Sequence, residues 1–209
     1  MNIRPKAAKG VNDVVVQKVL QNIRSRGMRQ ASVLDLGTGQ GYNAWKLGEE
    51  LKKIGVVFSS MCVDIDEGEF QLKGVEGVTF AVADLNNEFN FGEFDFVIAT
   101  EVIEHLENPY AFIRGCMANL KRGGKAYFTT PNVDAVYSLV KILLKKTPHK
   151  FGFGNREHMM PMHPFMVENV YPQAKFSYTR GLMKIPFTVP FPIGGRMFGE
   201  TLVVEIERQ

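Results

Sequence analysis

The sequence predicts an α/β domain whose mostly parallel sheet is covered by helices on both faces. Short apolar runs alternate with helix-like segments over residues 13–130. A glycine-rich turn joins one of these runs to the helix after it. Of the 209 residues, 45% are hydrophobic and 22% are charged, as in soluble globular domains. Strands that alternate with helices are joined by crossovers, and this arrangement gives a parallel sheet buried on both faces.

The expected strands share an apolar run that ends at glycines or polar residues. In chain order they cover residues 32–36, 56–65, 78–82, 94–100 and 125–130. A last run, 201–208, alternates apolar and polar residues like an exposed or edge strand. A stretch rich in proline and aromatic residues, 185–198, precedes it.

The expected helices show apolar residues at a spacing of three and four. They cover residues 13–26, 42–54, 109–120 and 133–146. Asp13 is expected to cap the first helix, and the Gly123-Gly124 pair to end the third. The fourth is amphipathic and basic, with Lys141, Lys145 and Lys146 beside its apolar face.

Charge and cysteine usage narrow the class of protein. The net charge of +3 is too small to indicate nucleic-acid binding. However, residues 74–113 hold eight acidic and no basic residues, whereas 141–150 hold four lysines and no acid. No apolar stretch is long enough to span a membrane and no signal sequence is recognisable, so we expect a cytoplasmic protein. Cys62 and Cys116 are expected to be buried thiols.

The strongest signal is the turn that begins at Asp35 and carries Gly37, Gly39 and Gly41. Glycines allow positive φ angles and let a ligand approach main-chain N–H groups. A dinucleotide fingerprint would have its third glycine at position 42, where Tyr42 stands, so pyrophosphate binding is disfavoured. Asp64 ends the next strand, where a carboxylate can accept both hydroxyls of a ribose.

Five ordered blocks make the sequence resemble the class I S-adenosylmethionine-dependent methyltransferases over residues 30–132. The blocks are VLDLGTGQG, MCVDID, VADLN, FDFVIATEVIEHL and LKRGGKAYFTTPN. The resemblance implies a Rossmann-like three-layer sandwich with a seven-stranded sheet and an antiparallel C-terminal strand. It also implies S-adenosylmethionine as cofactor. The expected cofactor-binding residues are Asp35, Gly37, Thr38, Gly39, Gly41, Asp64, Ile65, Asp84, Leu85, Thr100 and Glu101.

Within this set the resemblance assigns parts of the cofactor to particular residues. Gly37 is expected near the methionine amino group, Asp64 at the ribose, and Asp84 with Leu85 at the adenine. Thr100 and Glu101 would flank the methionine end.

The resemblance also divides the single expected domain, 1–209. The parts are an N-terminal helical cap (1–30), a cofactor-binding core (31–132), a lid and acceptor region (133–199) and the C-terminal strand (200–209).

The segment from Glu101 to His105 carries the candidate chemistry. If this segment is helical, Glu101, Glu104 and His105 share one face. His105 is expected to act as a general base beside Glu104, and His163 is a further catalytic candidate. The alternative is a divalent metal bound by Glu101, Glu104, His105 and His158, because small-RNA 2′-O-methyltransferases and ubiquinone-pathway O-methyltransferases carry a similar block. The same block also begins a helix in methyltransferases without metal, so the metal-free site is favoured.

We expect methyl transfer to an oxygen of a small-molecule or lipid-like acceptor. The basic helix near 136–146 could rest on an anionic membrane. RNA is the second substrate class, through a metal-dependent 2′-O-methyltransferase. A non-catalytic subunit that only binds S-adenosylmethionine is an alternative of another class, and a nicotinamide oxidoreductase is disfavoured by the glycine spacing. The sequence does not predict the oligomeric state.

Overall fold

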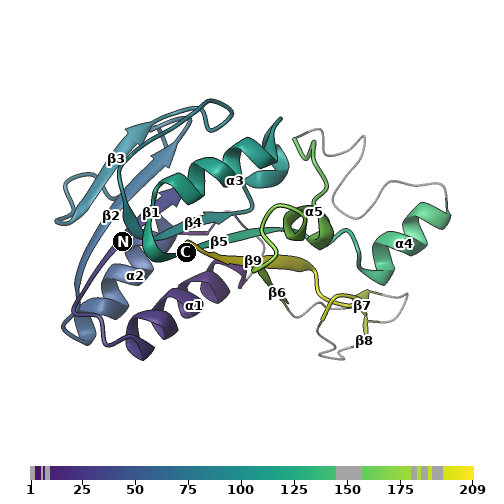
Figure 1. Ribbon diagram of the computed structural model, residues 1–209, viewed down its shortest axis with the longest axis horizontal. Coiled ribbons are helices and arrows are strands. Elements are labelled where there is room, and N and C mark those ends of the chain that lie inside the picture. The colour runs from purple at the N-terminus through teal and green to yellow at the C-terminus, as the bar shows by residue number, and fades with distance from the viewer. Residues whose placement is uncertain are drawn as a thin grey trace.

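A seven-stranded sheet organises the protein (Figure 1). The computed structural model describes residues 3–5, 7, 10–144, 157–179, 183–184, 188–189 and 195–209. The strand order is β3-β2-β1-β4-β5-β9-β6. These strands cover Gln30–Leu36 (β1), Val57–Asp64 (β2), Val78–Val82 (β3), Phe94–Thr100 (β4), Leu120–Pro131 (β5), Lys175–Tyr178 (β6) and Thr201–Glu207 (β9). A separate pair consists of Met183–Lys184 (β7) and Thr188–Val189 (β8).

The strand directions confirm the expected mostly parallel sheet, but the expected edge position of residues 201–208 is wrong, because β9 lies between β5 and β6 and is largely buried. The strands from β1 to β5 pair in parallel, while β9 runs antiparallel to β5. β6 then pairs antiparallel with β9 and forms one edge of the sheet, and β3 forms the other. The carboxyl ends of parallel strands lie at the same end of the sheet, and ligands bind at that end.

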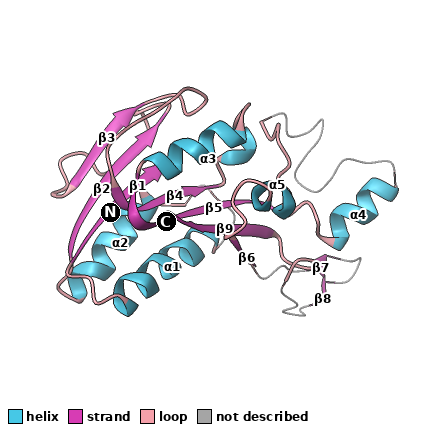
Figure 2. Ribbon diagram, in the orientation of Figure 1, coloured by secondary structure: helices cyan, strands magenta, loops and turns pink. Residues whose placement is uncertain are grey.

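Helices lie on both faces of this sheet (Figures 1 and 2). They cover Val11–Ser25 (α1), Tyr42–Lys53 (α2), Pro109–Ala118 (α3), Val136–Leu143 (α4) and Pro164–Glu168 (α5), with a 3₁₀ turn (η1) at Ile103–His105. α1 and α2 bury Val19 and Leu47 against Phe96 of the sheet. α3 buries Phe112 against Phe128 on the opposite face. Cys62 and Cys116 are buried free thiols, as expected.

The expected cap of the first helix is wrong. α1 begins at Val11, two residues before Asp13, and its capping residue is Gly10 with φ 84°. Asp13 lies in the first turn and accepts a hydrogen bond from the Tyr42 hydroxyl at 2.9 Å. Its carboxylate therefore links the first turns of α1 and α2.

The Gly123-Gly124 pair does not end a helix. α3 ends at Ala118, and both glycines lie inside β5, where the pairing with β4 shifts register. A Cβ at Gly124 would lie 2.8 Å from the Lys121 carbonyl oxygen and 3.0 Å from that of Asp95. The glycines therefore allow the strand to bend close to its neighbour.

The fourth helix is shorter than expected. α4 covers Val136–Leu143 instead of 133–146, and Lys145 and Lys146 lie outside the described residues. Of the stretch 185–198, the structure describes 188–189 and a turn at 195–198. Within the described part of the chain, no helix has the length and apolar character that crossing a membrane requires.

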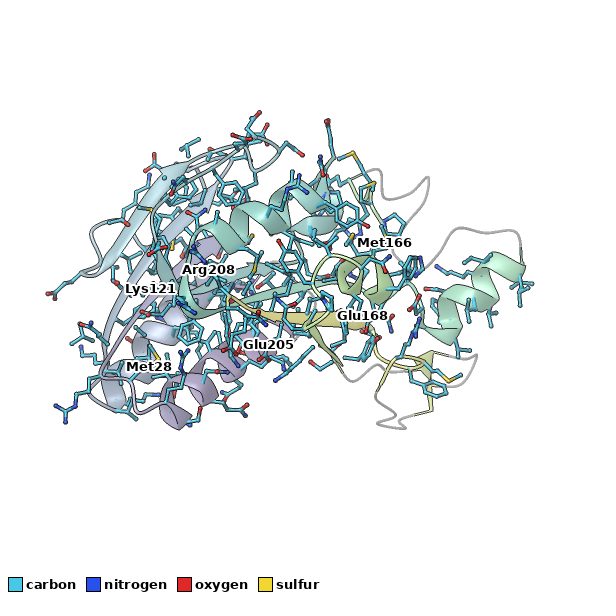
Figure 3. All side chains as sticks on the ribbon, viewed as in Figure 1. Met28, Lys121, Met166, Glu168, Glu205 and Arg208 are labelled. Carbon is cyan, nitrogen blue, oxygen red and sulfur yellow. The ribbon has the colours of Figure 1, made fainter. Side chains whose placement is uncertain are left out.

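Several ion pairs lie at the opposite end of the sheet, near the amino ends of the parallel strands. Lys125 Nζ lies 2.8 Å from Glu205, and Lys121 Nζ lies 3.0 Å from Asp95. Figure 3 shows Lys121, Glu205 and Arg208 in this region, away from Met166 and Glu168 on α5.

Candidate active site

The glycine turn between β1 and α2 has the backbone that the sequence predicts. Gly37, Gly39 and Gly41 all have positive φ, at 68°, 54° and 89°. The N–H groups of Gly37 and Thr38 donate to the Val63 carbonyl at 2.8 and 3.0 Å, which fixes the turn against β2. A Cβ at Gly37 would lie 2.4 Å from Val102 Cγ2, so the position has no room for a side chain.

Asp35 supports this turn from inside the protein. Its side chain is fully buried and accepts hydrogen bonds from Thr38 Oγ1 at 2.7 Å and Asn43 Nδ2 at 3.2 Å. Burial raises the pKa of Asp35 to about 6, although these two hydrogen bonds lower it and the charge of Asp64 raises it further. The carboxylate therefore holds the turn in shape.

Two amides that no sequence pattern indicated extend this network. Asn43 Nδ2 also donates to Thr100 Oγ1 at 3.1 Å, and Asn12 Nδ2 donates to Asn43 Oδ1 at 2.9 Å. Asn12 and Asn43 are both buried. The network thus connects α1 and α2 to the ends of β1 and β4, and buried polar groups need such partners.

A cleft of about 310 Å³ opens at the carboxyl ends of β1, β2, β3 and β4. Its lining residues come from four separate connections of the sheet. They are Gly37, Asp64, Ile65, Ala83, Asp84, Leu85, Asn86, Glu101, Val102, His105 and Leu106. Of the expected cofactor-binding residues, the structure brings Gly37, Asp64, Ile65, Asp84, Leu85 and Glu101 to this cleft. Asp35, Thr38, Gly39, Gly41 and Thr100 lie in the network and turn behind it.

Two carboxylates are held at the cleft by backbone N–H groups. Asp64 Oδ2 accepts from Gly39 N at 2.7 Å, and its Oδ1 accepts from Ile65 N at 2.8 Å. Asp84 Oδ1 accepts from Asn86 N at 2.9 Å. Each carboxylate oxygen has a second lone pair, so Asp64 can still accept ribose hydroxyls. The cleft therefore suits a nucleoside ligand.

The helical face expected for Glu101, Glu104 and His105 is wrong. Glu101 has a left-handed backbone with φ 56°, and only Ile103–His105 form a 3₁₀ turn. The Glu101 N–H donates to Thr129 Oγ1 at 3.0 Å, and the Thr129 hydroxyl donates to Glu101 Oε1 at 3.2 Å. The left-handed residue directs the chain away from β4, so Glu101 belongs to the strand end and not to the turn.

Glu104 and His105 instead come together with His158. One ligand atom of each lies within 4.8 Å of the others, and Glu104 is fully buried. The two imidazole rings lie 4.7 Å apart at 90°. Backbone N–H groups of Met159 and Met160 donate to the Glu104 carbonyl at 2.8 and 3.1 Å, which fastens this segment to η1.

The tautomer of His105 follows from its partner. His105 Nδ1 lies 2.9 Å from the Glu157 carbonyl oxygen, which can only accept a hydrogen bond. Nδ1 therefore carries the proton, and Nε2 keeps a lone pair in the neutral ring. Such a nitrogen can accept a proton or bind a metal ion. Two imidazoles and a carboxylate are ligands that Zn²⁺ and Mn²⁺ accept, and Glu101 is not part of this group.

His163 lies in a different cluster. Its Nδ1 is 2.5 Å from Asp134 Oδ1, and Arg196 Nε donates to Asp134 Oδ2 at 2.9 Å. The His163 ring stacks on Phe165 with centroids 5.6 Å apart. These partners are 29 and 62 residues apart in the chain, so sequence spacing could not have identified Asp134 and Arg196.

Curated relatives share only part of this chain. It is 27% identical to the ubiquinone biosynthesis O-methyltransferase of Coxiella burnetii over 128 residues, which are 58% of this chain and 51% of that protein. It is 29% identical to the Xanthomonas axonopodis protein of the same name over 162 residues, 68% of this chain and 62% of that protein. The chain thus spans about half to under two thirds of the length of these relatives.

Solved structures share the fold. A SAM-dependent methyltransferase from Archaeoglobus fulgidus superposes with a TM-score of 0.59 at 17% identity and covers 94% of both chains. One from Aquifex aeolicus has a TM-score of 0.56 at 14% identity and covers 93% of this chain and 89% of that one.

The family comparison covers most of the described elements. A family profile described as "Methyltransferase domain" matches residues 10–176, from the start of α1 into β6. The matched residues include the glycine turn, the cleft and the Glu104–His105–His158 cluster. The chain therefore belongs to the methyltransferase-domain family, within the class I S-adenosylmethionine-dependent methyltransferases.

Proposed function

We propose that this protein transfers a methyl group from S-adenosylmethionine to a hydroxyl oxygen of a small-molecule acceptor. One observation carries the proposal: His105 lines the cleft beside Glu101 while its Nδ1 donates to a backbone carbonyl. This places an imidazole with a proton-accepting nitrogen where the methionine end of the cofactor is expected. The printed name of the relatives, O-methyltransferase, supports an oxygen acceptor.

The reaction requires the acceptor hydroxyl to be aligned with the S–CH₃ bond and to lose its proton. The acceptor oxygen attacks the sulfonium methyl, an O–C bond forms, and the S–C bond breaks to leave neutral S-adenosylhomocysteine. His105 Nε2 takes the hydroxyl proton and later releases it to solvent. Glu104 is buried within 4.8 Å of His105, and its carboxylate would stabilise the imidazolium that forms.

A second candidate is metal-assisted transfer, which the clustering of Glu104, His105 and His158 favours. Those three residues would hold a divalent ion, and the ion would make the acceptor hydroxyl more acidic when bound. His105 would then serve as a ligand and could not act as the base. RNA with a 2′-hydroxyl is one acceptor of this kind.

Contact with a membrane surface is proposed for α4. The side chains of Leu139, Ile142 and Leu143 are 51%, 48% and 82% exposed, and Ser138 is the buried residue of this helix. α4 stands apart from the sheet (Figure 1). Lys141 lies with Nζ 5.0 Å from the Tyr137 ring, and the sequence continues with further lysines. An apolar helix with basic residues suits an anionic lipid surface and a lipid-like acceptor.

Transfer of labelled methyl from S-adenosylmethionine into a fractionated host extract tests the proposal. We expect label in the small-molecule or lipid fraction, unchanged by a chelator. His105→Gln should lower this label at least about 100-fold, because general bases contribute that much. The affinity of His105→Gln for S-adenosylhomocysteine should stay within about threefold, since the base acts on the acceptor.

Matched acidic variants separate the buried carboxylate from its surroundings. Glu104→Gln should lower transfer, whereas Glu107→Gln, an exposed acid in the same segment, should not. Label in RNA that a chelator abolishes would replace the proposal with the metal-assisted one. Binding of S-adenosylhomocysteine without labelling of any fraction would instead indicate a non-catalytic subunit.

A further inference from the structure

A second polar cluster surrounds Asp134, just after β5. Its side chain is only 12% exposed, yet both carboxylate oxygens are used. Oδ1 accepts from His163 Nδ1 at 2.5 Å, and Oδ2 accepts from Arg196 Nε at 2.9 Å. One nearly buried carboxylate therefore fixes an imidazole and a guanidinium together.

The backbone around this cluster is also fixed. Asn132 is 2% exposed and accepts from Asp134 N at 3.1 Å. Its Nδ2 donates to the carbonyl oxygens of Arg196 and Gly199, both at 2.8 Å. A buried amide thus ties the turn that carries Arg196 to the end of β5, and this holds the backbone of Arg196 in place.

The two fixed side chains keep unused polar atoms at the surface. The Arg196 side chain is 61% exposed, and within the described residues Nε is its only bonded nitrogen. Both Nη groups therefore remain as donors in the geometry that matches a carboxylate or phosphate. His163 is 37% exposed and uses Nδ1 for Asp134, and in the imidazolium form its Nε2–H is a further donor for an anion. The Asp134 carboxylate offsets the charge of the Arg196 guanidinium but does not occupy its Nη groups.

The cluster lies within reach of the cleft. His158 packs against His105, and His163 follows it by five residues, which span at most about 18 Å. α5, which His163 precedes, lies beyond the ends of β4 and β5 (Figure 1). Met159 and Phe165 in this segment are 50% and 54% exposed and offer apolar surface. A small molecule could therefore extend from the cleft to Asp134.

We propose that Arg196 and His163, held by Asp134, bind an acidic oxygen group of the methyl acceptor, either a carboxylate or a phosphate. The inference rests on the proposed function, because it assigns this cluster to the acceptor of that reaction. It narrows the acceptor to a molecule with an anionic group remote from the hydroxyl that is methylated.

Titration of benzoate and of inorganic phosphate into the protein saturated with S-adenosylhomocysteine tests this subsite. The readout is the NMR signal of the His163 ring, assigned with His163→Gln. We expect a saturable shift with at least one probe, and the probe that binds identifies the acidic group. Arg196→Gln should weaken binding of that probe at least tenfold, because it removes the guanidinium donors.

Two further variants keep the result interpretable. Arg122→Gln removes an exposed arginine near the other end of β5 and should bind the probe like the natural protein. Arg196→Lys keeps the charge beside Asp134 but removes the planar fork, so it should also bind more weakly while its affinity for S-adenosylhomocysteine is unchanged.

Several outcomes would overturn the proposal. One is that neither probe shifts the His163 signal, and another is that both Arg196 variants bind as Arg122→Gln does. Loss of binding to phosphatidylglycerol vesicles in Arg196→Gln, without any effect of the soluble probes, would assign the cluster to lipid headgroups instead. Probe binding without methyl transfer into any extract fraction would leave this subsite standing and refute the proposed function.

Discussion

Asp35 shows how a single buried carboxylate sets the pH dependence of the glycine turn. Its pKa is raised from 3.8 to about 6 in the folded protein, with burial as the main cause. As pH rises, the unfolded chain therefore loses this proton first. The free energy of unfolding therefore falls between the two pKa values, by about 2 kcal/mol from roughly pH 4.5 to pH 7.5. Above the pKa of the folded protein it stays constant. Below the unfolded pKa this loss is absent.

The prediction for Asp35 is that Asp35→Asn removes this pH dependence. Urea unfolding at about pH 4.5 and about pH 7.5 measures how much the free energy of unfolding falls between the two. This fall should be smaller in Asp35→Asn than in the natural protein by about 2 kcal/mol. Asp66→Asn, an exposed acid after β2, serves as control and should keep the drop. An equal drop in Asp35→Asn and the natural protein would place the titration elsewhere.

Gly37 and Gly74 allow backbone strain to be separated from crowding. Both have positive φ, 68° and 76°, but a Cβ at Gly37 meets Val102 whereas one at Gly74 meets open space. Gly74→Ala should cost about 1–2 kcal/mol of stability through backbone strain alone. Gly37→Ala should cost about 1–3 kcal/mol more, because of overpacking, and should weaken S-adenosylhomocysteine binding. Equal losses in urea unfolding would show that Val102 moves aside freely.

At the scale of elements, local signals predicted strands better than helix ends. β4 has the predicted bounds because its apolar run ends at a polar turn on both sides. The start of α1 could not be predicted, because a glycine without a side-chain cap precedes it. The glycine turn was predictable because its residues are consecutive in the chain. The contacts of Asn43 with Asp35 and Thr100, and of Asp134 with His163 and Arg196, were not predictable, since only the fold brings these residues together.

The exposed apolar surface of α4 predicts binding to anionic vesicles. Replacing Leu143 and Leu144 together by serine should weaken sedimentation with phosphatidylglycerol vesicles at least about tenfold, because burial of one leucine contributes roughly 1.5–3 kcal/mol. Val57→Ser changes an apolar residue on β2 that is 70% exposed and should have no effect. Equal binding of all three proteins, or none by the natural protein, would refute membrane contact.

On the scale of the whole molecule, the cleft joins elements that are distant in the chain. Its lining comes from the ends of β1, β2 and β4 and from the loop after β3. A ligand bound there contacts strands from one edge of the sheet to its centre. The same sheet order explains why residues 37, 64, 84 and 101 could be assigned to one site from sequence: all follow parallel strands, and their carboxyl ends coincide.

Because the cleft joins these strands, ligand binding should stabilise the whole domain. At about 100 times its Kd, S-adenosylhomocysteine should add roughly 2.7 kcal/mol to the free energy of unfolding. For a domain of this size that corresponds to a rise in Tm of about 5–10 °C. Asp64→Ala should abolish most of this rise at the same ligand concentration, because both oxygens of Asp64 are held at the cleft by backbone N–H groups. Asp66→Ala, an exposed acid two residues later, should keep the full rise. Equal shifts in both variants would mean that the ribose lies away from Asp64 and that the cofactor enters the cleft in another orientation.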